Sequence, residues 1–83
     1  MYDRRLVEAD VRDFILSEFL NGEDPSLLTN DTALISAGII DSIGTLKLVA
    51  FLENRFDISL SAHEATSDRL DTVNLITELV LEK

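Results

Sequence analysis

The sequence predicts an all-α fold, a four-helix bundle of three main helices plus a short third helix. Three stretches repeat apolar residues at steps of three and four, which is the spacing of one helix face. Only three glycines and one proline interrupt the chain, and the apolar-polar alternation of strands is scarce. Because 83 residues make one domain at most, these helices are expected to share one core.

The first main helix is predicted from about Asp3 to Leu20. Its apolar positions follow the helical period and are Leu6, Val7, Val11, Phe14, Ile15 and Leu20. Asn21 and Gly22 are expected to end it, since glycine readily takes the left-handed conformation that follows many helices.

A long loop is predicted between this helix and the next, from Asn21 to Ile40. Turn-forming residues fill it, and a short helical turn is expected after Pro25. A loop of this length in a small domain is either functional or held down by its own apolar side chains. We expect the second, through Leu27, Leu28, Leu34, Ile35, Ile39 and Ile40.

The second main helix is predicted to begin at Asp41 or Ser42, either of which can cap a helix, and to run to about Phe56. It has two apolar faces. One holds Leu48, Leu52 and Phe56, joined by Val49; the other holds Ile43, Leu46 and Ala50. Either the helix is central and packs on both faces, or Ile43 and Leu46 stay exposed as a docking patch beside Ser42.

Two further helices complete the prediction. Ser61 and Glu64 match the capping-box pattern, so a short third helix is expected to follow and to end near Ser67 and Asp68. The last helix is expected to begin at Asp71 or Thr72. Its apolar face would consist of Val73, Leu75, Ile76, Leu79 and Val80.

Charge and composition exclude several classes of function. A net charge of -9 argues against nucleic acid and suits basic protein partners. With no cysteine and one histidine, His63, the sequence offers no usual zinc site, and it shows no catalytic triad or glycine-rich phosphate loop. No stretch resembles a signal peptide or a membrane span, so we expect a cytoplasmic monomer with no catalytic residues of its own.

Ser42 is the residue on which chemistry is expected to occur. It lies where a loop meets a helix, which would present its hydroxyl to solvent, and a helix N-terminus favours an attached phosphate. Position alone leaves a second interpretation open, in which Ser42 only caps the helix.

The segment Gly38-Ile39-Ile40-Asp41-Ser42-Ile43 resembles the modification signature of the acyl and peptidyl carrier proteins. The similarity covers nearly the whole chain. Upstream, Asp31-Thr32-Ala33-Leu34 followed by Gly38 is similar to that family's approach to its serine. Downstream, the segment 48–56 resembles its second helix, and Asp71-Thr72-Val73 with Leu75-Ile76 resembles its last.

The resemblance implies a single carrier domain over residues 1–83, with an acyl-carrier-protein-like fold and a phosphopantetheine arm on Ser42. A phosphopantetheinyl transferase would attach the arm from coenzyme A, and Asp41 would help engage that enzyme and its magnesium. Ile43, Leu46 and Lys47 would contact partner enzymes. These partners are an acyl- or aminoacyl-loading ligase and a downstream acyltransferase or synthase. The arm would also supply the thiol that this cysteine-free chain lacks.

Departures from the fatty-acid pattern bear on the cargo. Gly44, Lys47, Asn54 and Arg55 stand where fatty-acid carriers typically have acidic residues. The chain looks closer to D-alanyl and stand-alone aminoacyl carriers, so an aminoacyl or specialised acyl cargo is favoured over bulk fatty-acid synthesis. The alternative from another class is an unmodified helical interaction module in which Ser42 is only a cap.

Overall fold

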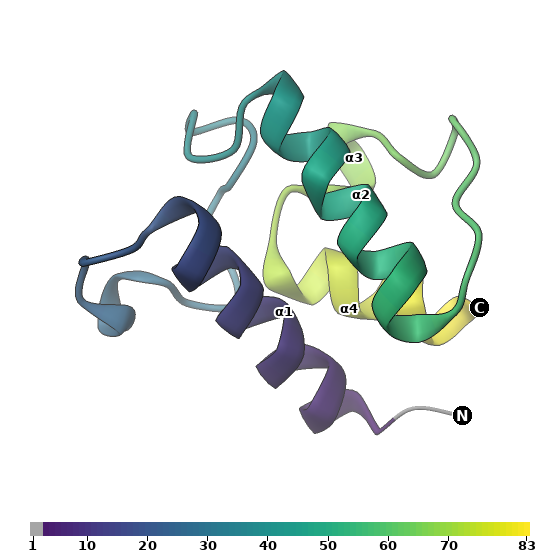
Figure 1. Cartoon of the computed structure of the whole chain (residues 1–83), viewed down its shortest axis with the longest axis horizontal. Helices are drawn as coiled ribbons and strands as arrows, with labels where there is room; N and C mark the ends of the chain where they lie inside the picture. Colours follow the sequence, from purple (N-terminus) through teal and green to yellow (C-terminus); the bar gives the residue numbers. More distant parts are fainter. Residues whose placement is uncertain (1–2) are drawn as a thin grey trace.

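The computed structural model describes residues 3–83, and within them it contains four α-helices and no β-strand. A short 3-10 helix lies between the first two. The elements, in chain order, are α1 (Arg4–Phe19), η1 (Pro25–Leu27), α2 (Ser42–Phe56), α3 (Ser67–Leu70) and α4 (Val73–Glu82) (Figure 1). The all-α prediction, with three main helices and a short third one, is confirmed.

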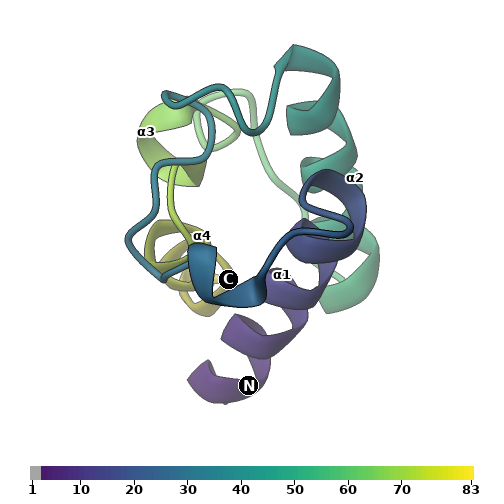
Figure 2. The ribbon, with the colours of Figure 1, turned by 90° about the vertical axis from the view of Figure 1, so that its left-hand side faces the viewer.

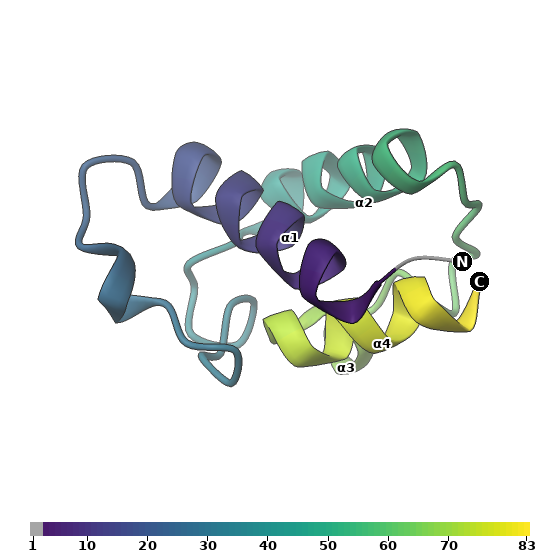
Figure 3. The same cartoon turned by 90° about the horizontal axis from the view of Figure 1, so that it is seen from below.

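The helices enclose one apolar core. α1 and α2 lie on one side of the molecule and α3 and α4 on the other (Figure 2 and Figure 3). α1 packs against α4, and α3 against α4. The core draws on every helix and on the long loop, and its residues are Val7, Val11, Ile15, Leu28, Leu34, Ile40, Leu48, Leu52, Phe56, Leu70, Val73, Ile76, Leu79 and Val80.

Helix α1 begins and ends close to its predicted bounds. Asp3 caps it, since its Oδ1 accepts a hydrogen bond from the backbone N–H of Arg5 at 2.8 Å. The helix ends at Phe19, so Leu20 is the C-cap instead of the last helical residue. Gly22 takes the expected left-handed conformation, with φ at +88°, two residues later.

The long loop is held down by its own apolar residues, as predicted. The helical turn expected after Pro25 is η1, and Asp24 caps it by accepting from Ser26 N–H at 2.9 Å. Leu28, Leu34 and Ile40 are buried, while Ile35 and Ile39 are half-buried. Leu27 departs from the prediction, because 62% of it is exposed and it holds nothing down.

The predicted bounds of the third helix are wrong. α3 begins at Ser67, where the sequence pattern places its end. Ser61 and Glu64 do interact, through a 3.0 Å bond from Ser61 N–H to Glu64 Oε1, but the chain makes only one turn there. His63 lies in that turn, where it is exposed and not helical.

A physical reason for this difference is that no apolar side chain of the turn enters the core, so a helix there would gain little from burial. Glu64 instead binds Lys83 Nζ at 2.7 Å. This contact, together with the Ser61 N–H, lowers the pKa of Glu64 to about 2.

Helix α4 begins after Thr72, whose Oγ1 accepts from Leu75 N–H at 3.1 Å. Val73, Ile76, Leu79 and Val80 are buried as predicted, whereas Leu75 is half-buried. Thr77 is also fully buried, and its hydroxyl has no hydrogen-bond partner among the described residues. A buried hydroxyl without a partner lowers stability.

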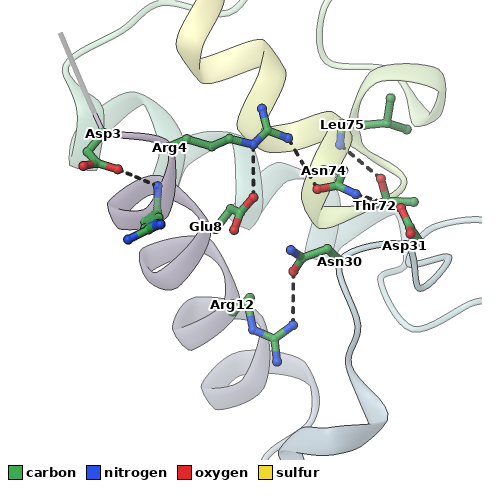
Figure 4. A network of polar contacts seen from close by, with 10 residues as sticks. Asp3, Arg4, Glu8, Arg12, Asn30, Asp31, Thr72, Asn74 and Leu75 are labelled. Atoms are coloured by element: carbon green, nitrogen blue, oxygen red, sulfur yellow. Dashed lines mark hydrogen bonds and ion pairs between the residues drawn. The ribbon is translucent and has the colours of Figure 1, made fainter.

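Polar contacts join the loop to α1 and α4 (Figure 4). Asn74 Nδ2 donates to Asp31 Oδ1 at 2.8 Å, and Asn74 N–H donates to the Asn30 carbonyl at 3.0 Å. On the other side, Arg12 donates to Asn30 Oδ1 at 3.3 Å. Arg4 reaches both Glu8 and the Asn74 side chain. The loop is therefore fixed by two helices before it reaches α2.

Candidate functional site

Ser42 is the first residue of α2, and it is exposed. Its hydroxyl makes no hydrogen bond within residues 3–83. The cap of this helix is Asp41, whose Oδ1 accepts from Gly44 N–H at 2.7 Å. Of the two residues able to cap the helix, Asp41 does so, and the interpretation of Ser42 as the cap is wrong.

The opening of α2 has hydrogen-bond donors that its own cap does not use. Thr45 donates to the Asp41 carbonyl through its N–H at 2.8 Å and its Oγ1 at 3.0 Å. The N–H groups of Ser42 and Ile43 have no acceptor among the described residues. With the helix dipole, these donors suit a phosphate esterified to the neighbouring hydroxyl. The residues present therefore fit a phosphopantetheine attached to Ser42.

Gly44 allows α1 to pack closely against this opening. A Cβ atom at Gly44 would lie 2.7 Å from Phe19 Cε1, 3.0 Å from Ile40 Cγ2 and 3.1 Å from Asp41 Oδ1. Real Cβ contacts are longer than the first of these, so a larger residue would displace the Phe19 ring. Gly44 thus matters for packing beside Ser42, a role that the sequence did not reveal.

The loop that leads to Ser42 is fixed to the far side of the molecule by Asp71. The Asp71 carboxylate accepts from the N–H groups of Leu34, Ile35 and Ser36 at 3.2, 2.8 and 2.9 Å. Its other oxygen accepts from Ser36 Oγ at 2.7 Å. The Ser36 donors and then the other N–H groups lower the pKa of Asp71.

Two backbone hydrogen bonds connect Asp71, through Leu34, to the residue that precedes the site, Ile40. Leu34 N–H donates to the Asp71 carbonyl at 2.7 Å, and the Leu34 carbonyl accepts from Ile40 N–H at 3.0 Å. Between them Gly38 has φ at +81°, in the left-handed region that favours glycine, and closes a turn onto Ile35. Ile40 is followed directly by Asp41 and Ser42, so the Ser42 backbone is positioned from the start of α4.

The two faces of α2 have different environments. Leu48, Leu52 and Phe56 are buried, whereas Ile43 is 68% exposed and Leu46 is 71% exposed. Lys47 is exposed beside them. Of the two alternatives for this helix, the structure has the one with an exposed apolar patch next to Ser42.

A hollow of about 290 Å³ adjoins this opening, between the end of α1, the loop and the first turns of α2. Its lining includes the apolar Phe19 and Ile39 and the charged Glu18, Asp41 and Lys47. The hollow therefore offers an apolar surface together with acidic and basic side chains. No pattern in the sequence indicates it, because its walls come from three separate segments.

Other kinds of site were sought in residues 3–83. No three histidine, cysteine or acidic side chains there gather in a way that could hold a metal ion. None of the helices in that range is long and apolar enough to cross a membrane.

Comparison with known proteins identifies the family. No family model matches the chain. The D-alanyl carrier protein of Streptococcus gordonii is 42% identical over 76 residues, which are 92% of this chain and 92% of that protein. Those of Streptococcus sanguinis and Streptococcus thermophilus are each 41% identical over the same length and shares. Identity of this extent over nearly the whole length agrees with the carrier signature at Asp41 and Ser42, and the chain belongs to the D-alanyl carrier protein family.

Proposed function

We propose that this protein carries an aminoacyl group, with D-alanine as the first candidate, as a thioester on a phosphopantetheine arm attached to Ser42. The observation that carries the proposal is the Ser42 hydroxyl, which is exposed at the opening of α2 and not used in capping it. The kinship with D-alanyl carrier proteins supports the aminoacyl cargo.

The residues of the chain would serve attachment and recognition. Ser42 supplies the hydroxyl to be esterified, and the N–H groups of Ser42 and Ile43 would hold the phosphate of the arm. Asp41 keeps one carboxylate oxygen on Gly44 N–H, which leaves the other to engage the transferase. When bound, the arm provides a thiol for thioester formation, and a tether raises the effective concentration of cargo at each partner.

Recognition would fall to the exposed patch beside Ser42. Ile43 and Leu46 would pack against apolar side chains of the partner enzymes, and Lys47 would add a positive charge. The partners are a phosphopantetheinyl transferase, an aminoacyl-loading ligase and a downstream acyltransferase. We place these encounters in the cytoplasm, where coenzyme A and ATP are available.

A loading assay tests this function. The chain is incubated with a phosphopantetheinyl transferase, coenzyme A, ATP, an aminoacyl-loading ligase and radiolabelled D-alanine. Labelling of the protein that neutral hydroxylamine removes is expected, since hydroxylamine cleaves thioesters. L-alanine and a short acyl substrate, each with its own ligase, report which cargo is preferred.

The Ser42→Ala and Ser42→Asp variants separate the carrier from an unmodified interaction module. Asp suits the first turn of a helix, where the dipole favours a negative charge, but it cannot be esterified in this way. Both variants are expected to fold and to take up no label. Label retained by either variant would contradict attachment at Ser42, and a wild-type protein that takes up no label from any substrate would contradict the carrier role.

A further inference from the structure

The hollow beside Ser42 adjoins the residue that would bear the arm. Its volume of about 290 Å³ lies at the low end for small-molecule sites, which suits a small chemical group better than an element of a partner enzyme. Asp41 and Ile43, the neighbours of Ser42 in the chain, both line it. A group attached to Ser42 therefore starts at the rim of this hollow.

The walls of the hollow carry opposite charges that do not neutralise each other. Glu18 comes from α1 and Lys47 from α2; both are exposed, and neither forms an ion pair within residues 3–83. Asp41, the other acid in the lining, already accepts the capping bond from Gly44 N–H. Glu18 is consequently the carboxylate that is free to bind a cation in the hollow.

Glu18 lies in the last turn of α1, where a negative charge is unfavourable. The C-terminal end of a helix is the negative end of its dipole, and cations stabilise it. The last turn of α1 contains no basic residue. A cation bound beside Glu18 would thus interact favourably with both the carboxylate and the helix end, and an ammonium group provides such a cation.

The lining also includes an apolar surface. Phe19 and Ile39 are half-buried, and both line the hollow. The Phe19 ring is held in place, because it meets Phe14 edge to face with 5.9 Å between the ring centroids and lies against Gly44 on its other side. This surface would accept a methyl-sized side chain without rearrangement of the wall.

We infer that this hollow holds the aminoacyl end of the arm when the arm folds back onto its own protein. The α-ammonium of the cargo would lie at Glu18, and its carbonyl oxygen would accept a hydrogen bond from Lys47 Nζ. The alanine methyl group would pack on Phe19 and Ile39. The inference rests on the proposed function and deepens it, because Glu18 gives the chain a preference for amino acids over acyl groups without an ammonium.

Weak contacts are enough to populate this state, because the cargo is tethered. A short flexible tether gives an effective concentration on the order of 1 mM, so an intrinsic Kd of about 1 mM would fill the hollow about half the time. One exposed ion pair changes such an equilibrium by about fivefold at most. The loaded arm would therefore exchange between the hollow and solvent, which keeps the cargo available to partner enzymes.

Nuclear magnetic resonance of the loaded protein tests the inference. A phosphopantetheinyl transferase installs the loaded arm directly from a D-alanyl coenzyme A analogue, in which an amide replaces the thioester to prevent hydrolysis. A propionyl arm, installed in the same way, has the methyl group and no ammonium. Relative to the propionyl arm, the D-alanyl arm is expected to move the backbone N–H signals of Glu18 and Phe19 and to leave those of α4 in place.

A matched pair of variants isolates the charge of Glu18. Glu18→Gln removes that charge with little change of size, and Glu78→Gln does the same at an exposed position of α4. The first is expected to reduce the signal differences between the two arms by about two- to fivefold, and the second to leave them unchanged.

The α-ammonium of the D-alanyl arm gives a second measurement, since a carbon-13 label in the alanine reports when it loses its proton. A nearby carboxylate favours the protonated amine and raises its pKa. The pKa of this ammonium is therefore expected to be lower in Glu18→Gln than in the wild type or in Glu78→Gln.

Equal signals for the two arms at Glu18 and Phe19 would overturn the inference and leave the carrier function standing, because the intact mass shows that the arm is attached. An effect of Glu78→Gln as large as that of Glu18→Gln would also overturn it, since the response would then be to net charge alone. If the chain accepts no arm from either analogue, the proposed function fails, and the inference fails with it.

Discussion

Asp71 and Ser36 lie 35 positions apart in the chain and are joined by two hydrogen bonds, from Ser36 N–H at 2.9 Å and from Ser36 Oγ at 2.7 Å. Because Leu34 links the same segment to Ile40, this contact fixes the loop that leads into Ser42. A carboxylate before α4 thus helps to position a hydroxyl at the start of α2.

Replacing Asp71 with Asn tests this attachment. The amide keeps the shape but has one acceptor oxygen and no charge, so we expect a loss of about 1 kcal/mol, limited by solvent screening. Thermal unfolding at neutral pH measures it. Asp68→Asn, at an exposed acid in α3, serves as the control and should change stability much less.

The difference in stability between the wild-type protein and Asp71→Asn should depend on pH. The pKa of Asp71 is lowered in the folded state, so its contribution is fully present above the unfolded pKa of about 4. This contribution is lost as the pH falls through the lowered pKa that Asp71 has in the folded state. The gap in stability between wild type and Asp71→Asn should therefore close below about pH 4; a gap that stays constant to pH 2 would contradict the assigned contacts.

Gly44→Ala should destabilise the protein although alanine is the better helix former. The gain in helix propensity is about 1 kcal/mol, but the new Cβ would lie 2.7 Å from Phe19 Cε1. We expect displacement of the ring to outweigh the gain, with a net cost of about 1 kcal/mol. In a Phe19→Leu background the same change should be neutral or stabilising. Chemical denaturation measures the change in stability. An equal change for Gly44→Ala in the wild-type and Phe19→Leu backgrounds would contradict the close approach of Gly44 to the Phe19 ring.

Thr77→Val should raise stability. The Thr77 hydroxyl is fully buried and has no partner within residues 3–83, and valine has nearly the same shape without the polar atom. A gain of about 1 kcal/mol is expected from removing the desolvation cost. Urea unfolding measures the change. A loss of stability on substitution would mean that the hydroxyl has a partner after all.

Leu48→Ala and Leu46→Ala form a matched pair on α2. Leu48 is fully buried and Leu46 is 71% exposed. The first should cost about 2–5 kcal/mol through loss of burial and the cavity left behind. The second should leave the melting temperature nearly unchanged. Similar losses for both would mean that the two faces of α2 are assigned wrongly.

Much of the fold can be predicted from the sequence because it rests on local periodicity. α1, α2 and α4 follow their apolar repeats, and Pro25 predicts the short turn that η1 forms. α3 is misplaced for the opposite reason. The Ser61–Glu64 capping box is a local signal, and whether a helix grows from it depends on burial that only the folded molecule determines.

The parts of the candidate site that rest on local sequence signals can be predicted in the same way. The segment around Asp41 and Ser42 points to the serine, but the apolar pattern of α2 leaves open whether Ile43 and Leu46 are packed or exposed, and only the structure shows them exposed. The roles of Asp71 and Gly44 are not predictable, because each depends on contacts between segments distant in sequence. For Asp71 the only sequence signal is a polar residue before the last helix, which indicates a cap and not a contact with the loop.

The most direct test of the central claim is intact-mass spectrometry of the chain after incubation with coenzyme A and a broad-specificity phosphopantetheinyl transferase. We expect the protein to gain one phosphopantetheine unit, peptide mapping to locate it on Ser42, and Ser42→Ala to gain nothing. An unchanged mass for the wild-type chain, or a gain that persists in Ser42→Ala, would contradict attachment at Ser42.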